Sequence, residues 1–266
     1  MRWALGVEYR GNRFAGWQRQ PDCQTVQSHL EKAIEAIAGH PVAVHAAGRT
    51  DRGVHASMQV VHVDVEVHRP EMAWVRGVNS FMSDDVAVMW ARPVDERFHA
   101  RFSAIKRHYR YFIYSHPVRP TLLAGQVGWL HQKLDLSLMQ EAAGLLLGEH
   151  DFSAFRSSEC QAKSPVKNLE LLNVALASTQ PSNGVLVEVQ ATANAFLHHM
   201  VRNLVGALIH VGTQKVQPGW VKEVLDGKDR HKAAPMFAAE GLYLAGVLYP
   251  DEYALPTWNT TGRLAW

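Results

Sequence analysis

One stretch of the sequence places a carboxylate between cations and glycines. Asp51 stands between Arg49 and Arg52, and Gly48 and Gly53 bracket the three residues. The neighbouring positive charge is expected to keep the carboxylate ionised, and glycines allow the backbone to approach a bulky ligand. The pattern therefore favours a nucleophile or a base at a nucleic-acid surface. The same residues also fit an ordinary Asx-type turn between two strands, so the pattern alone leaves both interpretations open.

A second stretch, residues 97–111, interleaves cations with aromatic rings. Cations attract phosphate groups, and aromatic rings stack on bases. We expect Arg101 to meet phosphate and Tyr109 to meet a base. The alternative is a solvated strand face with ordinary core aromatics. The residues concerned are Arg97, Phe98, Arg101, Phe102, Lys106, Arg107, Tyr109, Arg110 and Tyr111.

A third candidate is Arg202, which lies within the densely apolar segment 196–211. A buried arginine requires a carboxylate partner. If Arg202 pairs with Asp51 across the two halves of the chain, the cleft between the halves becomes the active site, because ligand pockets form preferentially in such places.

Metal and cofactor motifs are missing from the sequence. The chain has 15 histidines, but it contains no His-Glu-x-x-His motif. His198 and His199 are adjacent, and neighbouring residues of a helix point about 100° apart. Neither a phosphate loop with Gly-Lys-Ser/Thr nor a dinucleotide fingerprint occurs. We therefore expect neither a catalytic metal nor a nucleotide cofactor.

Hydrophobic periodicity predicts the elements that position these residues. The first half is predicted to run strand, helix, strand, strand, helix, strand, and Asp51 would lie on the loop between its second and third strands. Thr25 is the expected N-cap of the first helix, and Gly39 is its expected stop. This order is typical of a ferredoxin-like sheet that is backed by helices on one face. The elements span residues 3–9, 26–37, 42–47, 61–67, 70–78 and 86–94.

The second half repeats this plan with additions, among them a short helix at 221–225 and a polar loop at 157–164. We predict an α+β protein made of two ferredoxin-like (RRM-like) halves, with mainly antiparallel sheets backed by helices and a cleft between the halves. Residues 1–104 would form the domain with the Asp51 loop, and residues 105–266 the second domain. The further strands are 109–114, 169–177, 185–191 and 242–248, and the further helices 136–147 and 196–211.

Composition restricts the class of protein without selecting a function. A chain of 266 residues with 47% hydrophobic content can bury a core. The net charge of +2 permits an RNA partner but does not require one. No stretch approaches the roughly 18 apolar residues of a membrane span, and we expect a cytoplasmic protein. Cys23 and Cys160 suggest neither a disulfide framework nor a zinc site.

Taken together, the motifs resemble the tRNA pseudouridine synthase A family, and the similarity covers nearly the whole chain. Seven family-like stretches follow one another in the expected order. They are residues 16–18, 47–56, 98–104, 109–111, 151–155, 196–206 and 241–244.

The resemblance implies an isomerase that converts uridine to pseudouridine at positions 38 to 40 of the tRNA anticodon stem-loop. It implies that Asp51 is the catalytic aspartate and that Arg202 pairs with it. Arg49 and Arg101 would extrude and hold the flipped target, and Tyr109 would pack on the uracil. The partners implied are tRNA and a second copy of the chain, and no cofactor is implied.

The sequence departs from the family pattern at three places. Arg10 stands where the family usually has an aspartate, His108 precedes Tyr109 at a variable position, and residues 258–266 form a tail without a family counterpart. None of these departures touches the expected active-site groups, so they put local RNA contacts in question rather than the reaction.

Two other functions compete with this hypothesis. A non-catalytic RNA-binding module could use the same sheets and aromatics. Such a binder gains nothing from a carboxylate that faces phosphate, so Asp51 favours the enzyme. A glycosidase-like hydrolase would need a second carboxylate near Asp51, and the family-like stretches supply none.

Overall fold

The computed structural model describes residues 1–179 and 184–256, so the predicted tail at 258–266 lies outside the described residues. The chain forms two compact units. Unit 1 contains residues 1–106 and the described residues from Leu244 onward, and unit 2 contains residues 107–243. The division into domains 1–104 and 105–266 stays a prediction, since compact contacts are not the same as independent folding. None of the helices described is both long and apolar enough to cross a membrane.

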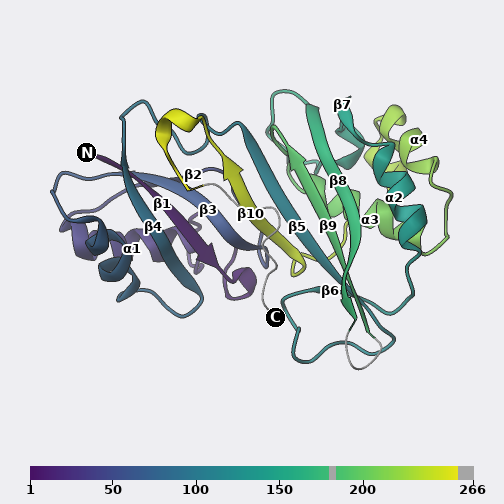
Figure 1. Ribbon diagram of the computed structural model, residues 1–266, viewed down its shortest axis with the longest axis horizontal. Helices are drawn as coiled ribbons and strands as arrows, with labels where there is room; N and C mark the ends of the chain where they lie inside the picture. Colours follow the sequence, from purple (N-terminus) through teal and green to yellow (C-terminus); the bar gives the residue numbers. More distant parts are fainter. Residues whose placement is uncertain (180–183, 257–266) are drawn as a thin grey trace. The chain divides into compact units, whose positions relative to one another are not determined.

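The sheet of unit 1 has the strand order β4-β1-β3-β10 (Figure 1). The central strand β1 (Arg2–Tyr9) pairs antiparallel with β3 (His55–Asp64) and with β4 (Val86–Val94). The short strand β2 (Val44–Ala46) pairs with one end of β3. β10 (Leu242–Leu248), which comes from the far end of the chain, lies beside β3.

The first helix begins and ends where its capping residues predict. α1 (Val26–Ala38) is preceded by Thr25, whose side chain accepts a hydrogen bond from the Ser28 amide, and it is followed by Gly39 in the left-handed conformation at φ 77°. These caps satisfy backbone groups that a helix end leaves unpaired. The predicted N-cap and stop of this helix are therefore confirmed.

A second, shorter helical segment of unit 1 packs against β4 and α1, and it includes the π-helical turn Ala73–Gly77. Its Trp74 is fully buried, and the Trp74 ring packs 5.8 Å from the ring of Trp3 on β1. The helical pattern expected after Pro70 is thus confirmed. The segment places a large aromatic residue in the core of unit 1.

In unit 2 the strand order is β5-β9-β8-β7, with antiparallel pairing between β5 and β9, β9 and β8, and β8 and β7. The strands are β5 (Lys106–Ser115), β9 (Val185–Ala193), β8 (Val166–Thr179) and β7 (Gly148–Asp151). A short strand, β6 (Gly128–Leu130), adds to β5 in parallel.

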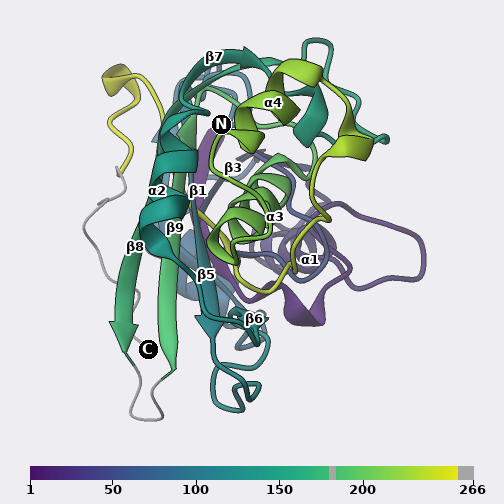
Figure 2. The ribbon, with the colours of Figure 1, turned by 90° about the vertical axis from the view of Figure 1, so that its right-hand side faces the viewer.

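Helices cover one side of this second sheet (Figure 2). α2 (Leu136–Gly144) packs on β8 and on α3 (Met200–Gly212), and α4 (Trp220–Gly227) lies against the segment Ser153–Phe155. Nearly all of α3 is buried. Both units therefore combine mainly antiparallel strands with helices, and the predicted α+β fold class is confirmed.

Two predicted element starts were wrong by four residues or more, each for a local reason. The strand expected at 61–67 begins at His55, because His55 and Gln59 are buried polar residues that mask the alternating pattern. The helix expected from residue 196 begins at Met200, because His199 adopts the left-handed conformation at φ 65°. A left-handed residue cannot continue a right-handed helix.

Candidate functional site

Asp51 lies on the loop that joins β2 to β3. Its side chain is half-buried, whereas the side chain of Arg49 is exposed. The amide of Val54 donates to the Asp51 carbonyl at 3.2 Å, and Gly53 has a φ of 81°. This conformation favours glycine, so the loop turns sharply just after the carboxylate.

Two residues of the sheet hold the loop from one side. The hydroxyl of Tyr9 lies 2.8 Å from Oγ1 of Thr50, which is buried. The amide nitrogen of the Gln59 side chain donates to the Gly48 carbonyl at 2.7 Å. It also lies 3.4 Å from the Tyr9 hydroxyl, so the three side chains form one buried network. The backbone on the N-terminal side of Asp51 is thereby fixed.

The segment of Gly16 and Trp17 holds the loop from another direction. The amide of Trp17 donates to the Thr50 carbonyl at 2.9 Å. Gly16 has a φ of 100°, and a Cβ atom placed on it would lie 3.0 Å from the Thr50 carbonyl oxygen and 3.2 Å from the Arg52 amide nitrogen. The close approach and the positive φ both require glycine at this position.

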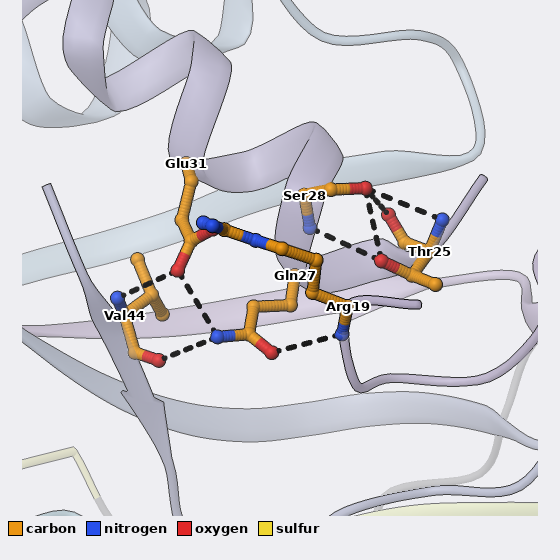
Figure 3. A network of polar contacts seen from close by, with 6 residues as sticks. All are labelled: Arg19, Thr25, Gln27, Ser28, Glu31 and Val44. Atoms are coloured by element: carbon orange, nitrogen blue, oxygen red, sulfur yellow. Dashed lines mark hydrogen bonds and ion pairs between the residues drawn. The ribbon is translucent and has the colours of Figure 1, made fainter. Parts of the chain in front are cut away.

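A network around Glu31 anchors that segment to α1 (Figure 3). The buried Glu31 carboxylate accepts from the Gln27 side chain and from the Val44 amide, both at 3.0 Å, and forms an ion pair with Arg19. The Arg19 amide donates to the Gln27 side-chain oxygen at 3.1 Å. Because Val44 begins β2, one carboxylate connects the helix, the segment before it and the strand that leads into the Asp51 loop.

Arg101 lies on a separate loop of unit 1, after β4, and its side chain is exposed. Its amide donates to Nδ1 of His99 at 3.1 Å, and its guanidinium carbon lies 5.6 Å from the centre of the Phe102 ring. The backbone at Arg101 is therefore held, and its side chain reaches the surface of unit 1.

Unit 2 carries the other two predicted residues. Tyr109 is half-buried on β5 opposite Ala191 of β9, and its ring meets Phe196 edge-on at 4.9 Å and 83°. Arg202 is half-buried on α3, and its Nε donates to the Phe237 carbonyl at 3.0 Å. The Phe237 amide donates back to the Arg202 carbonyl at 3.3 Å. Contacts within unit 2 therefore restrict the side chains of both Tyr109 and Arg202.

Unit 1 therefore holds Asp51 and Arg49 on one loop and Arg101 on another. The sequence analysis missed the residues that fix these loops, chiefly Tyr9, Gln59 and Glu31. Tyr9 lies at an apolar position of a strand pattern, which gives no hint that its hydroxyl has a role. A buried glutamine or glutamate carries no signal in the sequence, because its burial depends on distant residues.

Comparison with known proteins identifies the family to which this structure belongs. A family model described as tRNA pseudouridine synthase matches residues 6–103 and 142–250. The tRNA pseudouridine synthase A of Chromobacterium violaceum is 56% identical over 99% of both chains. The protein of the same name in Paraburkholderia phymatum is 51% identical over 99% of this chain and 96% of its own length. The one in Thiobacillus denitrificans is 54% identical over 96% of each chain. The chain belongs to the tRNA pseudouridine synthase family.

Membership of this family makes the protein an enzyme, an isomerase. Asp51, Arg49, Arg101 and Arg202 lie within the residues that the family model matches. Tyr109 lies between the two matched segments, in a region that the relatives at 99% coverage include.

Proposed function

We propose that this enzyme isomerises uridine to pseudouridine at positions 38 to 40 of the tRNA anticodon stem-loop, with Asp51 as its essential carboxylate. The observation that carries the proposal is the Asp51 loop itself. A half-buried carboxylate stands on a loop whose flanking residues are fixed by buried hydrogen bonds, in a chain of this family. A rigid support of this kind suits a group that must meet a reacting sugar within a fraction of an ångström.

The reaction breaks the bond between N1 of uracil and C1′ of ribose and forms a bond between C5 and C1′. The hydrogen on C5 leaves as a proton, and no oxidation occurs. The ionised Asp51 can attack C1′, add to the uracil ring or remove the 2′ proton, and each route needs the carboxylate in nearly the same place. The chemistry requires neither a metal nor a nucleotide cofactor.

The target uridine must leave the base stack before it can react. In the proposal, the exposed cations of Arg49 and Arg101 hold the displaced backbone, and Tyr109 packs its ring on the extruded uracil. Arg202 pairs with the Asp51 carboxylate and keeps it ionised. Phe196 supports this assignment for Tyr109, because its edge-on contact restricts the tyrosine ring.

The proposed partners are tRNA and a second copy of the chain, in a homodimer that binds one tRNA. The cytoplasm is the proposed location. The two partners follow from the family resemblance.

The first experiment measures tritium release from tRNA that carries tritium at C5 of its uracils, because the new bond to C1′ expels that hydrogen. The wild-type protein is expected to release tritium, and Asp51→Asn to release none while it binds tRNA with unchanged affinity. Asp84→Asn is the matched control, since Asp84 is an exposed aspartate of the same unit. It is expected to keep full activity.

Each other outcome has a definite meaning. Turnover by Asp51→Asn would remove the carboxylate from the mechanism. Tight tRNA binding without any release by the wild type would favour a non-catalytic RNA-binding module. Release of free uracil would instead indicate a hydrolase.

A further inference from the structure

The loop of residues 98–103 is tied down along its backbone. The guanidinium of Arg2 donates to the Phe98 carbonyl at 2.8 Å, and the buried hydroxyl of Tyr249 donates to the Ala100 carbonyl at 2.6 Å. The amide of Ser103 donates to the carbonyl of residue 99 at 2.8 Å. Phe98 and Ala100 are completely buried. The loop is therefore a rigid part of unit 1.

Two histidines add acceptors to this arrangement. Nδ1 of His62 accepts from the Ala100 amide at 3.1 Å. Nδ1 of His99 accepts from the amides of Arg101 and Phe102 at 3.1 and 3.3 Å. Burial is the main cause that lowers the pKa of both imidazoles, with smaller effects of neighbouring histidines and of Arg2, and the pKa of His62 falls to about 3. Both rings are thus neutral near pH 7 and can act as acceptors.

The same loop exposes one large aromatic side chain. Phe102 is 76% exposed, although both of its backbone neighbours are held. Its ring lies 4.3 Å from the ring of His99 at 36°, and the Arg101 guanidinium carbon lies 5.6 Å from its centre. A rigid, solvent-facing ring with a cation at its side matches a nucleotide, since the base can stack on the ring while its phosphate meets the cation.

We infer that Phe102 is a stacking platform for an unpaired base of the anticodon loop, and that His99 is the residue that positions Phe102 and Arg101 together. The inference rests on the proposed function, because it takes tRNA as the ligand. Since the loop is already ordered, little conformational entropy is lost when the base binds, which makes a rigid platform more effective than a mobile side chain.

The test is the dissociation constant of an anticodon stem-loop RNA, measured in the Asp51→Asn background so that no product forms. Phe102→Leu is expected to weaken binding roughly 10- to 100-fold, the range for loss of one base–aromatic stack. Phe102→Trp keeps an aromatic face and is expected to bind as well as the parent. Phe81→Leu is the control, because Phe81 is 56% exposed elsewhere in unit 1, and it is expected to change nothing.

A cycle with abasic RNA identifies the stacked base. Each loop nucleotide is replaced in turn by an abasic ribose. At one position the replacement is expected to weaken binding to the parent roughly 10-fold but to have little further effect on Phe102→Leu, because interacting pairs are not additive. Additive losses at every position would overturn the inference.

His99 is tested by replacing its acceptor. Asn offers a side-chain oxygen near the place of Nδ1, so His99→Asn is expected to bind RNA within about 3-fold of the parent, whereas His99→Leu binds about 10-fold more weakly. If both variants lost RNA affinity equally, His99 would act only through packing and not as a hydrogen-bond acceptor.

The remaining outcomes separate this inference from the proposed function. If Phe102→Leu binds the RNA as tightly as a parent that binds normally, the stacking role of Phe102 is overturned and the proposed function still stands. Dissociation of a dimer by Phe102→Leu would show that a second copy covers the ring, which also overturns it. Failure of the wild-type protein to bind or modify any tRNA would overturn the proposed function.

Discussion

The hydroxyl of Tyr9 lies 2.8 Å from Oγ1 of Thr50, the residue directly before Asp51. Tyr9 ends β1, so the central strand of unit 1 contacts the Asp51 loop through a buried side-chain hydrogen bond. The position of the proposed catalytic group therefore depends on the sheet and not only on the loop's own turn.

Tyr9→Phe removes this hydroxyl and keeps the ring. The free energy of unfolding is expected to fall by about 1–3 kcal/mol, because the buried Oγ1 of Thr50 loses this partner. Turnover is expected to fall roughly 10-fold through displacement of Asp51. Urea unfolding and tritium release measure the two effects. Tyr243→Phe, which removes a 2.8 Å bond to the Gln126 carbonyl in unit 2, is the control for stability loss without a catalytic defect. Equal turnover in the two variants would contradict the prediction.

Glu31→Gln tests the network that holds the segment before α1. An amide oxygen cannot replace a carboxylate that serves Arg19, Gln27 and the Val44 amide together, so unfolding is expected to become easier by about 1–3 kcal/mol. Chemical denaturation measures the change. Glu35→Gln alters an exposed glutamate of the same helix and is expected to shift stability by less than about 0.5 kcal/mol. A similar shift in both variants would show that the network contributes nothing specific.

Tyr109 is expected to act through its ring. Tyr109→Phe should keep most of the single-turnover rate, whereas Tyr109→Ala should lower it roughly 10- to 100-fold, because the flat partner of the uracil is lost. Rapid-quench measurements with saturating enzyme give this rate, and thermal unfolding verifies that both variants are folded. An alanine variant with the wild-type rate would refute the role of Tyr109.

Acid is expected to destabilise the protein below pH 6.5 through two buried histidines. Burial, with a smaller effect of His99, lowers the pKa of His62 to about 3, and burial with a smaller effect of Arg110 lowers that of His108 to about 4. The unfolded chain therefore binds more protons than the folded one between pH 6.5 and about 4. The contribution of these two histidines to the free energy of unfolding is fully present above pH 6.5, and it is lost as the pH falls through this window.

The expected slope is at most about 1.4 kcal/mol per pH unit for each histidine. Urea titrations at several pH values measure it, and His62→Asn should make the dependence shallower. Carboxyl groups with a lowered pKa, such as Asp64 beside Arg2, act at more acidic pH. A His62→Asn variant with an unchanged slope would exclude the histidine as a source of the acid sensitivity.

The sequence by itself determined what depends on neighbours along the chain. Thr25 and Gly39 predicted both ends of α1, because caps bond to backbone groups within the same turn. Short runs of apolar residues predicted the strands β1, β4 and β10, because such runs need only neighbouring positions to be recognised. The motif around Asp51 was visible because its cations and glycines are adjacent in the sequence.

Only the tertiary structure decided which distant residues meet. It placed β10 beside β3, seated Gly16 against the backbone of Thr50 and turned the hydroxyl of Tyr9 to that same residue. Such contacts leave no periodic pattern, because a single buried hydroxyl or carboxylate is specified by its partner's position in space. The support of the candidate site is built from these contacts, and so the sequence indicated the reactive groups but not what holds them.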